Sequence, residues 1–239
     1  MTAPAIWAVI PAAGRAKRFG GDVPKQYLEV AGQPLLAHAL DVLLAHPQVT
    51  GAMVALAADD PRWPGWTQLH GKPVLRCVGG GERADSVLAA LQALPAEVGA
   101  DALVLVHDAA RPNLQREDLD RLIEAATDAA DGAILAAPVR DTLKRADGDA
   151  CIVATEPREQ LWRALTPQAF RRGALTDALR QARSDGINVT DDAMAMEHAG
   201  AHPGLVEGRE DNLKVTTPAD LALAEFLLSH RATATIGPP

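Results

Sequence analysis

The sequence predicts a three-layer α/β fold, in which helices cover both faces of a mainly parallel sheet and a β-hairpin projects as an arm. Short apolar runs alternate with longer segments of helical period along most of the chain, as expected for parallel strands joined by helical crossovers. Between about 138 and 165 the pattern changes to alternating polar and apolar residues around a turn, which indicates an antiparallel hairpin. We therefore treat residues 1–239 as one domain that contains an arm at 138–160.

Parallel strands are predicted where short apolar runs are bounded by turn residues, at 6–10, 51–57, 73–78, 102–106 and 132–137. Helices are predicted where apolar residues recur at helical spacing, at 34–46, at 85–94 and through Leu119, Leu122, Ile123 and Ala126. Because 48% of the 239 residues are apolar, the chain has enough side chains to fill a full core.

The turn of the arm is predicted at 146–149. In the part of the chain that follows the arm, we predict a helix at 168–182, a further helix opened by Thr190 and a strand at 204–206. The last helix is predicted to begin at Thr217-Pro218, because a hydroxyl cap followed by a proline is a typical start signal.

The net charge of −8 predicts that the protein binds neither nucleic acid nor an anionic membrane surface, since both attract positively charged proteins. No apolar segment approaches the ~20 residues that span a bilayer, and residues 1–20 lack the pattern of a secretory signal. Cys77 and Cys151 belong to no metal-binding pattern, so we expect both to be buried thiols. These observations predict a cytoplasmic protein.

The loop after the first strand is the first candidate for binding a ligand. Ala12, Ala13 and Gly14 are small enough for a ligand to approach the backbone, whose N–H groups can bind phosphate oxygens. The loop matches neither a Walker A loop nor the dinucleotide glycine pattern, and an ordinary tight turn is the alternative. Four cations follow this loop, namely Arg15, Lys17, Arg18 and Lys25, and their positive charge suits a small anion.

Two further loops follow predicted strands and open at the same carboxyl edge of the sheet. The segment 79–86 begins with three glycines, whose backbone a ligand can approach, although a flexible connection is the alternative. In the segment 106–112, Asp108 can hold Mg2+ and Arg111 can bind an anion, unless the two form only a local ion pair. His107 alone is more often a structural histidine than a base.

A fourth segment, 207–214, supplies Asp211 and Lys214 between a strand and the last helix. The four segments together suit phosphoryl or nucleotidyl transfer, because cations and a metal neutralise the charge that builds up during in-line displacement. The sequence offers no convincing serine–histidine or cysteine–histidine nucleophile pair, which favours direct transfer without a covalent enzyme intermediate.

Six motifs occur in order across nearly the whole chain: PAAGxxxR with PKQY, GGxxRxDSV, VHDAARP, APVxDTxKR, LTPQ and EGRxDNxKVT. Together they resemble the 2-C-methyl-D-erythritol 4-phosphate cytidylyltransferase family of the non-mevalonate isoprenoid pathway. The resemblance implies a Rossmann-like α/β nucleotidyltransferase fold, and transfer of CMP from CTP to methylerythritol phosphate with Mg2+ and release of pyrophosphate. It also implies a homodimer held partly by the arm.

The same resemblance implies roles for individual residues. The nucleotide would be bound by Ala12, Ala13, Gly14, Gly80, Gly81 and Ser86. The CTP phosphates and the transition state would be stabilised by Arg18, Lys25 and Lys214. Methylerythritol phosphate would be held by Asp108, Arg111, Thr166, Thr190 and Lys214, and by Thr142 and Arg158 from the partner's arm. The metal would lie nearest Asp108 and Asp211.

The sequence departs from the family at two positions. Ala16 replaces a usual glycine, and Gly81 stands where many members carry an acid, so we expect the base contact there to come from backbone or water. The nearest alternative function is a cytidylyltransferase for ribitol phosphate or another polyol phosphate, whose nucleotide half would look similar. A non-catalytic nucleotide sensor is disfavoured because the basic residues and Asp108 are present together, and a dehydrogenase because the dinucleotide glycines are missing.

Overall fold

An eight-stranded sheet forms the centre of the computed structural model, which describes residues 5–14 and 23–234. The strand order across the sheet is β12 (Gly204–Glu207), β8 (Ala133–Pro138), β11 (Trp162–Arg171), β7 (Leu103–Val106), β1 (Ile6–Ala12), β4 (Val49–Leu56), β6 (Lys72–Val78) and β5 (Gln68–Leu69). Neighbouring strands are parallel except where β11 pairs with β7 and β8, and where β5 pairs with β6. The predicted mainly parallel sheet is therefore confirmed.

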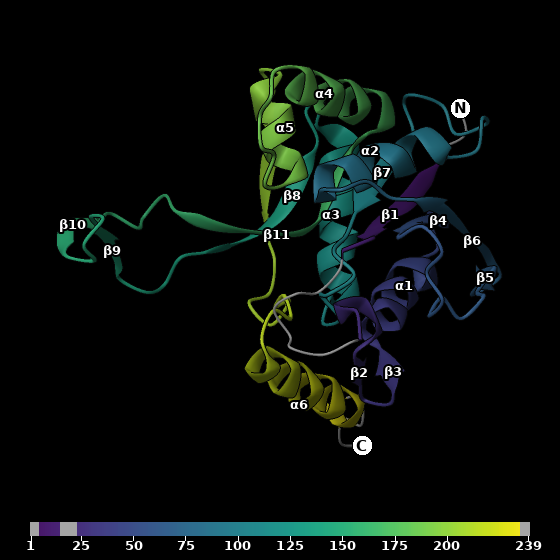
Figure 1. Ribbon diagram of the computed structural model, residues 1–239, viewed down its shortest axis with the longest axis horizontal. Helices are drawn as coiled ribbons and strands as arrows, with labels where there is room; N and C mark the ends of the chain where they lie inside the picture. Colours follow the sequence, from purple (N-terminus) through teal and green to yellow (C-terminus); the bar gives the residue numbers. More distant parts are fainter. Residues whose placement is uncertain (1–4, 15–22, 235–239) are drawn as a thin grey trace.

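Helices cover both faces of this sheet, as Figure 1 shows. One face packs against α1 (Leu35–Ala45) and α3 (Arg116–Asp128), and the other against α2 (Arg83–Ala93), α4 (Arg172–Ser184) and α5 (Asp192–His198). Residues of β1 alternate between the two cores, with Ile10 in the first and Val9 in the second. The three predicted layers are confirmed.

A smaller apolar cluster joins α6 (Pro218–Ala234) to the first connection of the sheet, which contains η1 (Lys25–Tyr27), β2 (Glu29–Val30) and β3 (Gln33–Pro34). The start of α6 is the predicted one, because Asp220 accepts hydrogen bonds from the backbone N–H groups of Thr216 and Thr217. Among the helices of the described residues, none is long and apolar enough to cross a membrane.

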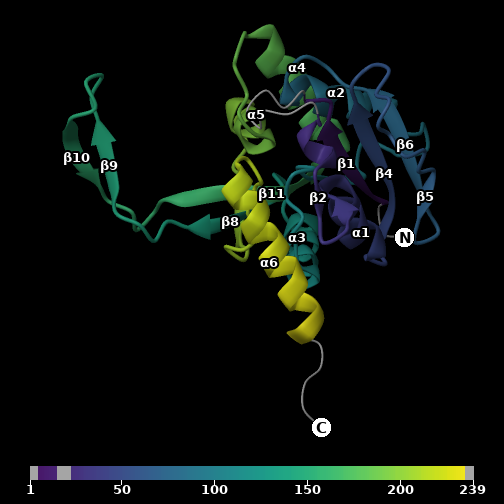
Figure 2. The ribbon, with the colours of Figure 1, turned by 60° about the horizontal axis from the view of Figure 1, so that its bottom comes forward.

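The predicted arm is a hairpin of β9 (Leu143–Ala146) and β10 (Ile152–Glu156), which pair antiparallel. Its turn is held by Asp147, whose carboxylate accepts hydrogen bonds from the backbone N–H groups of Asp149 and Cys151. Figure 1 and Figure 2 both show the hairpin extending away from the sheet. Cys151 lies exposed beside this turn and Cys77 is only half-buried, so the expectation of two buried thiols is wrong.

The start of one predicted helix and the cap of another differ from the structure. The helix predicted from Gln168 begins at Arg172, because Gln168 to Arg171 complete the long strand β11. The helix predicted to open at Thr190 is capped by Asp191, whose side chain accepts a hydrogen bond from the Met194 backbone. Both segments keep their place in the chain, but β11 adds a central antiparallel strand that the sequence did not predict.

Candidate active site

The carboxyl ends of β1, β6 and β7 surround a cavity of about 660 Å3. Residues from all four predicted segments line it, so the structure brings together parts of the chain that are far apart in sequence. The predicted residues on its wall are Ala12, Ala13, Gly14, Lys25, Gly80, Gly81, Ser86, Asp108 and Lys214. Arg18 lies outside the described residues, as does Ala16.

The glycine-rich loop packs tightly at its first two glycines. A Cβ on Gly79 would lie 2.6 Å from the Ala13 Cβ, and one on Gly80 would collide with the Asp85 side chain. The Gly80 N–H donates to the Ser86 hydroxyl at 3.1 Å, which fixes the loop against the first turn of α2. No described atom lies within 4 Å of a Cβ built on Gly81. The loop thus presents fixed backbone groups to the cavity, beside a helix N-terminus that favours anions.

Lys25 is held near the end of β1 by the residue that follows it. The Gln26 side chain is buried and donates through Nε2 to the Ala12 carbonyl at 2.7 Å. This bond fixes the short helix η1 beside the small residues Ala13 and Gly14, so that Lys25 lines the same cavity.

Asp108 lies at the centre of a cluster of cations. Its Oδ1 accepts a hydrogen bond from Arg83 Nε at 2.9 Å, and its Oδ2 lies 2.8 Å from Lys214 Nζ and 3.6 Å from Arg111 Nε. Burial opposes ionisation of this carboxyl, but the positive charges of Arg83, Lys214 and Arg111 outweigh it, so the pKa of Asp108 lies well below its usual range. Asp108 therefore stays ionised and orients three cations at one wall of the cavity.

Arg83 also binds a second carboxylate, through Nη2 to Asp192 Oδ2 at 2.8 Å. Asp192 is fully buried at the start of α5. Burial raises the pKa of Asp192, and the positive charge of Arg83 only partly opposes this. Sequence analysis assigned neither residue a role, although Arg83 is the arginine of the GGxxRxDSV motif.

Thr166 binds the backbone of Asp108 and does not line the cavity. Its hydroxyl accepts a hydrogen bond from the Asp108 N–H at 3.1 Å and lies 2.9 Å from His107 Nδ1. The other ring nitrogen of His107 lies 3.1 Å from the Arg111 carbonyl, an acceptor, so this network assigns the proton to Nε2 and makes Thr166 the donor to Nδ1. Burial lowers the pKa of His107 to about 4, which keeps the ring neutral and structural.

Arg111 is almost entirely buried and donates through Nη1 to the Asn212 carbonyl at 2.7 Å. Asn212 in turn donates through its side chain to the Thr166 carbonyl at 2.8 Å. These bonds attach the segment that carries Lys214 to the end of β7. Arg111 and Thr166 are not among the residues that line the cavity.

Besides Arg111 and Thr166, four further predicted residues lie away from the cavity wall. Thr142 and Arg158 are exposed where the arm leaves and rejoins the sheet, and Arg158 donates to the Arg140 carbonyl. Thr190 is exposed beside Met194, with its hydroxyl 3.5 Å from the Met194 sulfur. Asp211 forms an ion pair with Arg209 at 3.3 Å.

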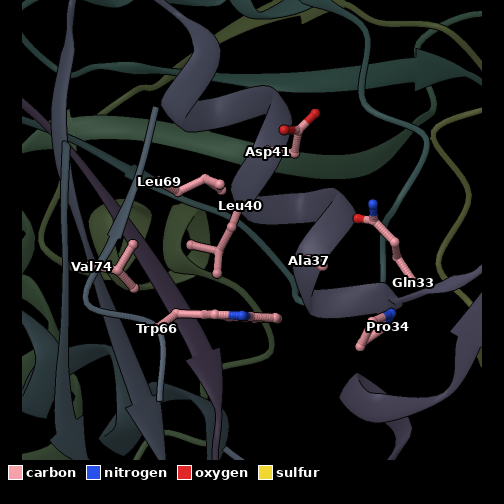
Figure 3. Close-up of a pocket in the computed structure, with 8 residues that line it drawn as sticks. All are labelled: Gln33, Pro34, Ala37, Leu40, Asp41, Trp66, Leu69 and Val74. Carbon is pink, nitrogen blue, oxygen red and sulfur yellow. The ribbon is translucent and has the colours of Figure 1, made fainter. Parts of the chain in front are cut away.

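A second hollow of about 300 Å3 lies between α1 and the β5–β6 edge of the sheet. Figure 3 shows Leu40, Trp66 and Val74 around it, with Gln33 and Asp41 on the helix side. It collects none of the predicted site residues, so the carboxyl-edge cavity remains the candidate active site.

Comparison with known proteins shows the family to which this chain belongs. The family model for 2-C-methyl-D-erythritol 4-phosphate cytidylyltransferase matches residues 6–230. A protein of that name from Stenotrophomonas maltophilia (strain R551-3) is 65% identical over 95% of this chain and 98% of its own. Another from Xanthomonas campestris pv. campestris (strain 8004) is 64% identical over 95% of this chain and 85% of its own.

Solved structures agree as well. A crystal structure of 4-diphosphocytidyl-2C-methyl-D-erythritol synthase superposes with a TM-score of 0.80 at 38% identity, over 94% of this chain and 99% of that one. The Francisella tularensis 2-C-methyl-D-erythritol 4-phosphate cytidylyltransferase superposes with a TM-score of 0.79 at 32% identity, over 93% of this chain and 99% of that one.

Proposed function

Because this chain belongs to the 2-C-methyl-D-erythritol 4-phosphate cytidylyltransferase family, we propose that the carboxyl-edge cavity is where its reaction takes place. The enzyme is a nucleotidyltransferase of isoprenoid biosynthesis that transfers CMP from CTP to methylerythritol phosphate, giving the CDP-linked alcohol and pyrophosphate. The observation that carries the location is the meeting, at one sheet edge, of small backbone segments, Lys25 and the Asp108 cluster.

The nucleotide binds to the loops after β1 and β6 in this proposal. Backbone groups of Ala12, Ala13 and Gly14 face the phosphates, while Gly80, Gly81 and Ser86 contact the ribose and cytosine. Fixed backbone groups can distinguish the cytosine amino group from the carbonyl of uracil, because a mismatched pair leaves a polar group unsatisfied. The tight packing of Gly79 and Gly80 supports this role, since it holds the loop in one conformation.

The acceptor phosphate itself attacks the α-phosphorus of CTP, so the protein needs no nucleophile of its own. Lys25 and Lys214 stabilise the charge that develops on the transferring phosphoryl group, together with Arg18. Lys214 can do so because Asp108 holds its ammonium group at 2.8 Å on the cavity wall. Asp108 therefore orients the cations and the acceptor. Arg111 and Thr166 hold Asp108 in place.

We propose Mg2+ as the cofactor. In the described part of the chain, no group of three acidic, histidine or cysteine side chains is placed to hold a metal. Mg2+ often uses one or two carboxylates with substrate phosphates and water, and Asp108 has lone pairs beyond those bound by Arg83 and Lys214. Asp108 fits as one ligand of an Mg2+ ion that the triphosphate would mainly hold. When bound, the ion would neutralise phosphate charge. Asp211, paired with Arg209, stays a prediction.

We also propose a homodimer in which Thr142 and Arg158 serve the partner's site. Both residues are exposed at the base of an arm that carries Ile152 at 67% and Val153 at 57% exposure. A two-stranded hairpin with such side chains is marginal alone and is stabilised by a second copy. We further propose a cytoplasmic location, because the exposed free thiol of Cys151 suits a reducing compartment.

Pyrophosphate release tests the function directly. The purified protein is given each of the four nucleoside triphosphates with methylerythritol phosphate, and CTP is then repeated with ribitol phosphate. We expect CTP to exceed UTP by roughly 10- to 100-fold in kcat/KM, which corresponds to about 1–3 kcal/mol. Equal turnover of CTP and UTP would contradict the role of the glycine-rich loop, and a preference for ribitol phosphate would favour the polyol-phosphate alternative.

A further inference from the structure

We propose that Arg83 is a positioning residue, which fixes the Asp108–Lys214 pair for catalysis and is itself anchored by Asp192. The inference rests on the function proposed for the carboxyl-edge cavity. It adds two residues to that function, of which Asp192 does not line the cavity, and it connects α5 to the Asp108–Lys214 pair.

Arg83 acts as a clamp that joins Asp108, just after β7, to Asp192 at the start of α5. Arg83 is the first residue of α2, and Asp192 is the first residue of α5, 109 positions later in the chain. The guanidinium donates through Nε to Asp108 at 2.9 Å and through Nη2 to Asp192 at 2.8 Å. A planar guanidinium presents these donors at a fixed angle, so it sets the direction of both carboxylates at once, which a lysine cannot do.

This clamp acts on catalysis through Asp108. One oxygen of Asp108 is taken by Arg83, and the other lies 2.8 Å from Lys214 Nζ. If Arg83 is removed, Oδ1 loses its partner while Oδ2 keeps Lys214 and Arg111, so the carboxylate can rotate about its side-chain torsions and the ammonium group of Lys214 moves with it. Because a catalytic donor must be held at the place where charge develops, such a shift lowers the rate of the chemical step more than the affinity for CTP.

Asp192 anchors the clamp from outside the cavity. Its side chain is fully buried, it is not among the residues that line the cavity, and its carboxylate binds Arg83. An uncharged side chain of the same shape at this position therefore weakens the hold on Arg83 without touching a ligand. A loss of rate in such a variant is a signature of positioning, because Asp192 has no contact with the reacting groups.

Steady-state kinetics of three variants test the proposal, with Arg172→Ala as the matched control. Arg172 is also a part-buried arginine, but its guanidinium donates to the backbone carbonyls of Leu91 and Val98 rather than to carboxylates. The variants are Arg83→Ala, Asp192→Asn and the double variant. The readouts are kcat and KM for both substrates, the melting temperature, and kcat after addition of guanidinium ion.

We expect Arg83→Ala to lower kcat by about 100-fold and Asp192→Asn by about 10-fold, while KM for CTP changes by less than about threefold. The double variant should be no slower than Arg83→Ala, because residues that act through one another are not additive. Guanidinium should restore kcat in Arg83→Ala at least several-fold, since Arg83 lines the cavity. In Arg172→Ala we expect a lower melting temperature, kcat within about twofold of the wild type, and no recovery.

Near-normal kcat in folded Arg83→Ala and in Asp192→Asn would overturn the proposal, as would additive losses in the double variant. If Arg83→Ala does not fold, Asp192→Asn still decides, because it retains Arg83 and removes only a buried charge. A wild-type protein that makes no product from CTP and methylerythritol phosphate would instead contradict the proposed function.

Discussion

The carboxyl-edge cavity and the arm at 138–160 both carry residues of the predicted site, but they differ in how far the chain surrounds those residues. At the cavity, Asp108 is buried and its carboxylate is bound by Arg83 and Lys214. On the arm, β9 and all but the last residue of β10 are exposed. The predicted residues of the cavity are therefore held in place by contacts within one chain, whereas Thr142 and Arg158 of the arm lie at its surface.

The ion pairs of the cavity are also more buried than those of the arm. Asp108 and Arg83 belong to a largely buried network of several ion pairs, in which Asp108 also binds Lys214 and Arg83 also binds Asp192. The arm has ion pairs such as Arg145 with Glu156 at 2.6 Å, but exposed pairs contribute only about 0–1 kcal/mol. In the proposed dimer, a second copy would supply the surface that makes the arm rigid.

The largest expected effect concerns the cavity side. We expect Lys25→Ala to lower kcat/KM by on the order of 100-fold or more, because a donor aimed at developing charge is typically worth ~3 kcal/mol. The melting temperature should stay close to that of the wild type, since a single lysine on the cavity wall contributes little to packing. Pyrophosphate release and a thermal melt check both statements, and near-normal turnover would remove Lys25 from the proposed mechanism.

The next effect concerns the arm. Ile152→Asp combined with Val153→Asp should weaken dimerisation by roughly 30-fold, because charges replace apolar side chains that a partner would cover. Sedimentation velocity over a concentration series measures this shift. The matched control is Leu223→Asp, whose leucine is 50% exposed on α6, away from the arm, and should leave the equilibrium unchanged. An unchanged equilibrium in the arm variant would show that the arm is not the interface.

The fold was predicted best where the chain is locally regular. The parallel strands and their helices follow from short apolar runs, and the hairpin follows from its turn. β11 was missed because Pro167 interrupts its pattern and its pairing with β8 shifts register between Ala164 and Gln168. Proline in a strand usually marks an edge strand or a bulge, and the second applies here, because β11 lies between β7 and β8 and its register shifts around Pro167.

The site was predictable in its segments but not in its pairings. The loops that line the cavity were predictable because small residues and cations follow predicted strands. The sequence could not reveal the Arg83–Asp192 contact, which joins residues 109 positions apart through no local pattern. It also could not show that Thr166 turns its hydroxyl toward His107 and Asp108, because that depends on the position of β11 beside β7.

The tight packing of the cavity loops gives a smaller effect, with a control at a glycine outside the cavity. Gly80→Ala should lower kcat/KM by about 10-fold, because its Cβ would collide with Asp85 and displace the loop from the nucleotide. Gly99→Ala should stay within about twofold, since Gly99 does not line the cavity and no described atom lies within 4 Å of a Cβ built there. Assays with CTP as the varied substrate measure both, and equal losses in the two variants would contradict a loop held in one conformation.

The smallest expected effect is a pH dependence on the cavity side. Burial lowers the pKa of His107 to about 4 from an ordinary value of 6.5, so between these values the unfolded chain binds a proton that the folded chain does not. Stability therefore falls as pH falls, by about 1 kcal/mol from pH 6.5 to about 5.5. Urea unfolding of the wild type and His107→Asn should show this contribution vanish in the variant. An identical pH slope would contradict a neutral, buried His107.

The central claim is that a complete site combines the cavity of one chain with the arm of another. Mixing Arg158→Ala chains with Lys25→Ala chains under conditions of subunit exchange tests it most directly. Half of the dimers are then mixed, and each has one site without either defect, so we predict recovery to on the order of a quarter of wild-type activity. If Arg158 instead serves the cavity of its own chain, every site keeps one defect, and a mixture as inactive as its two components would contradict the account.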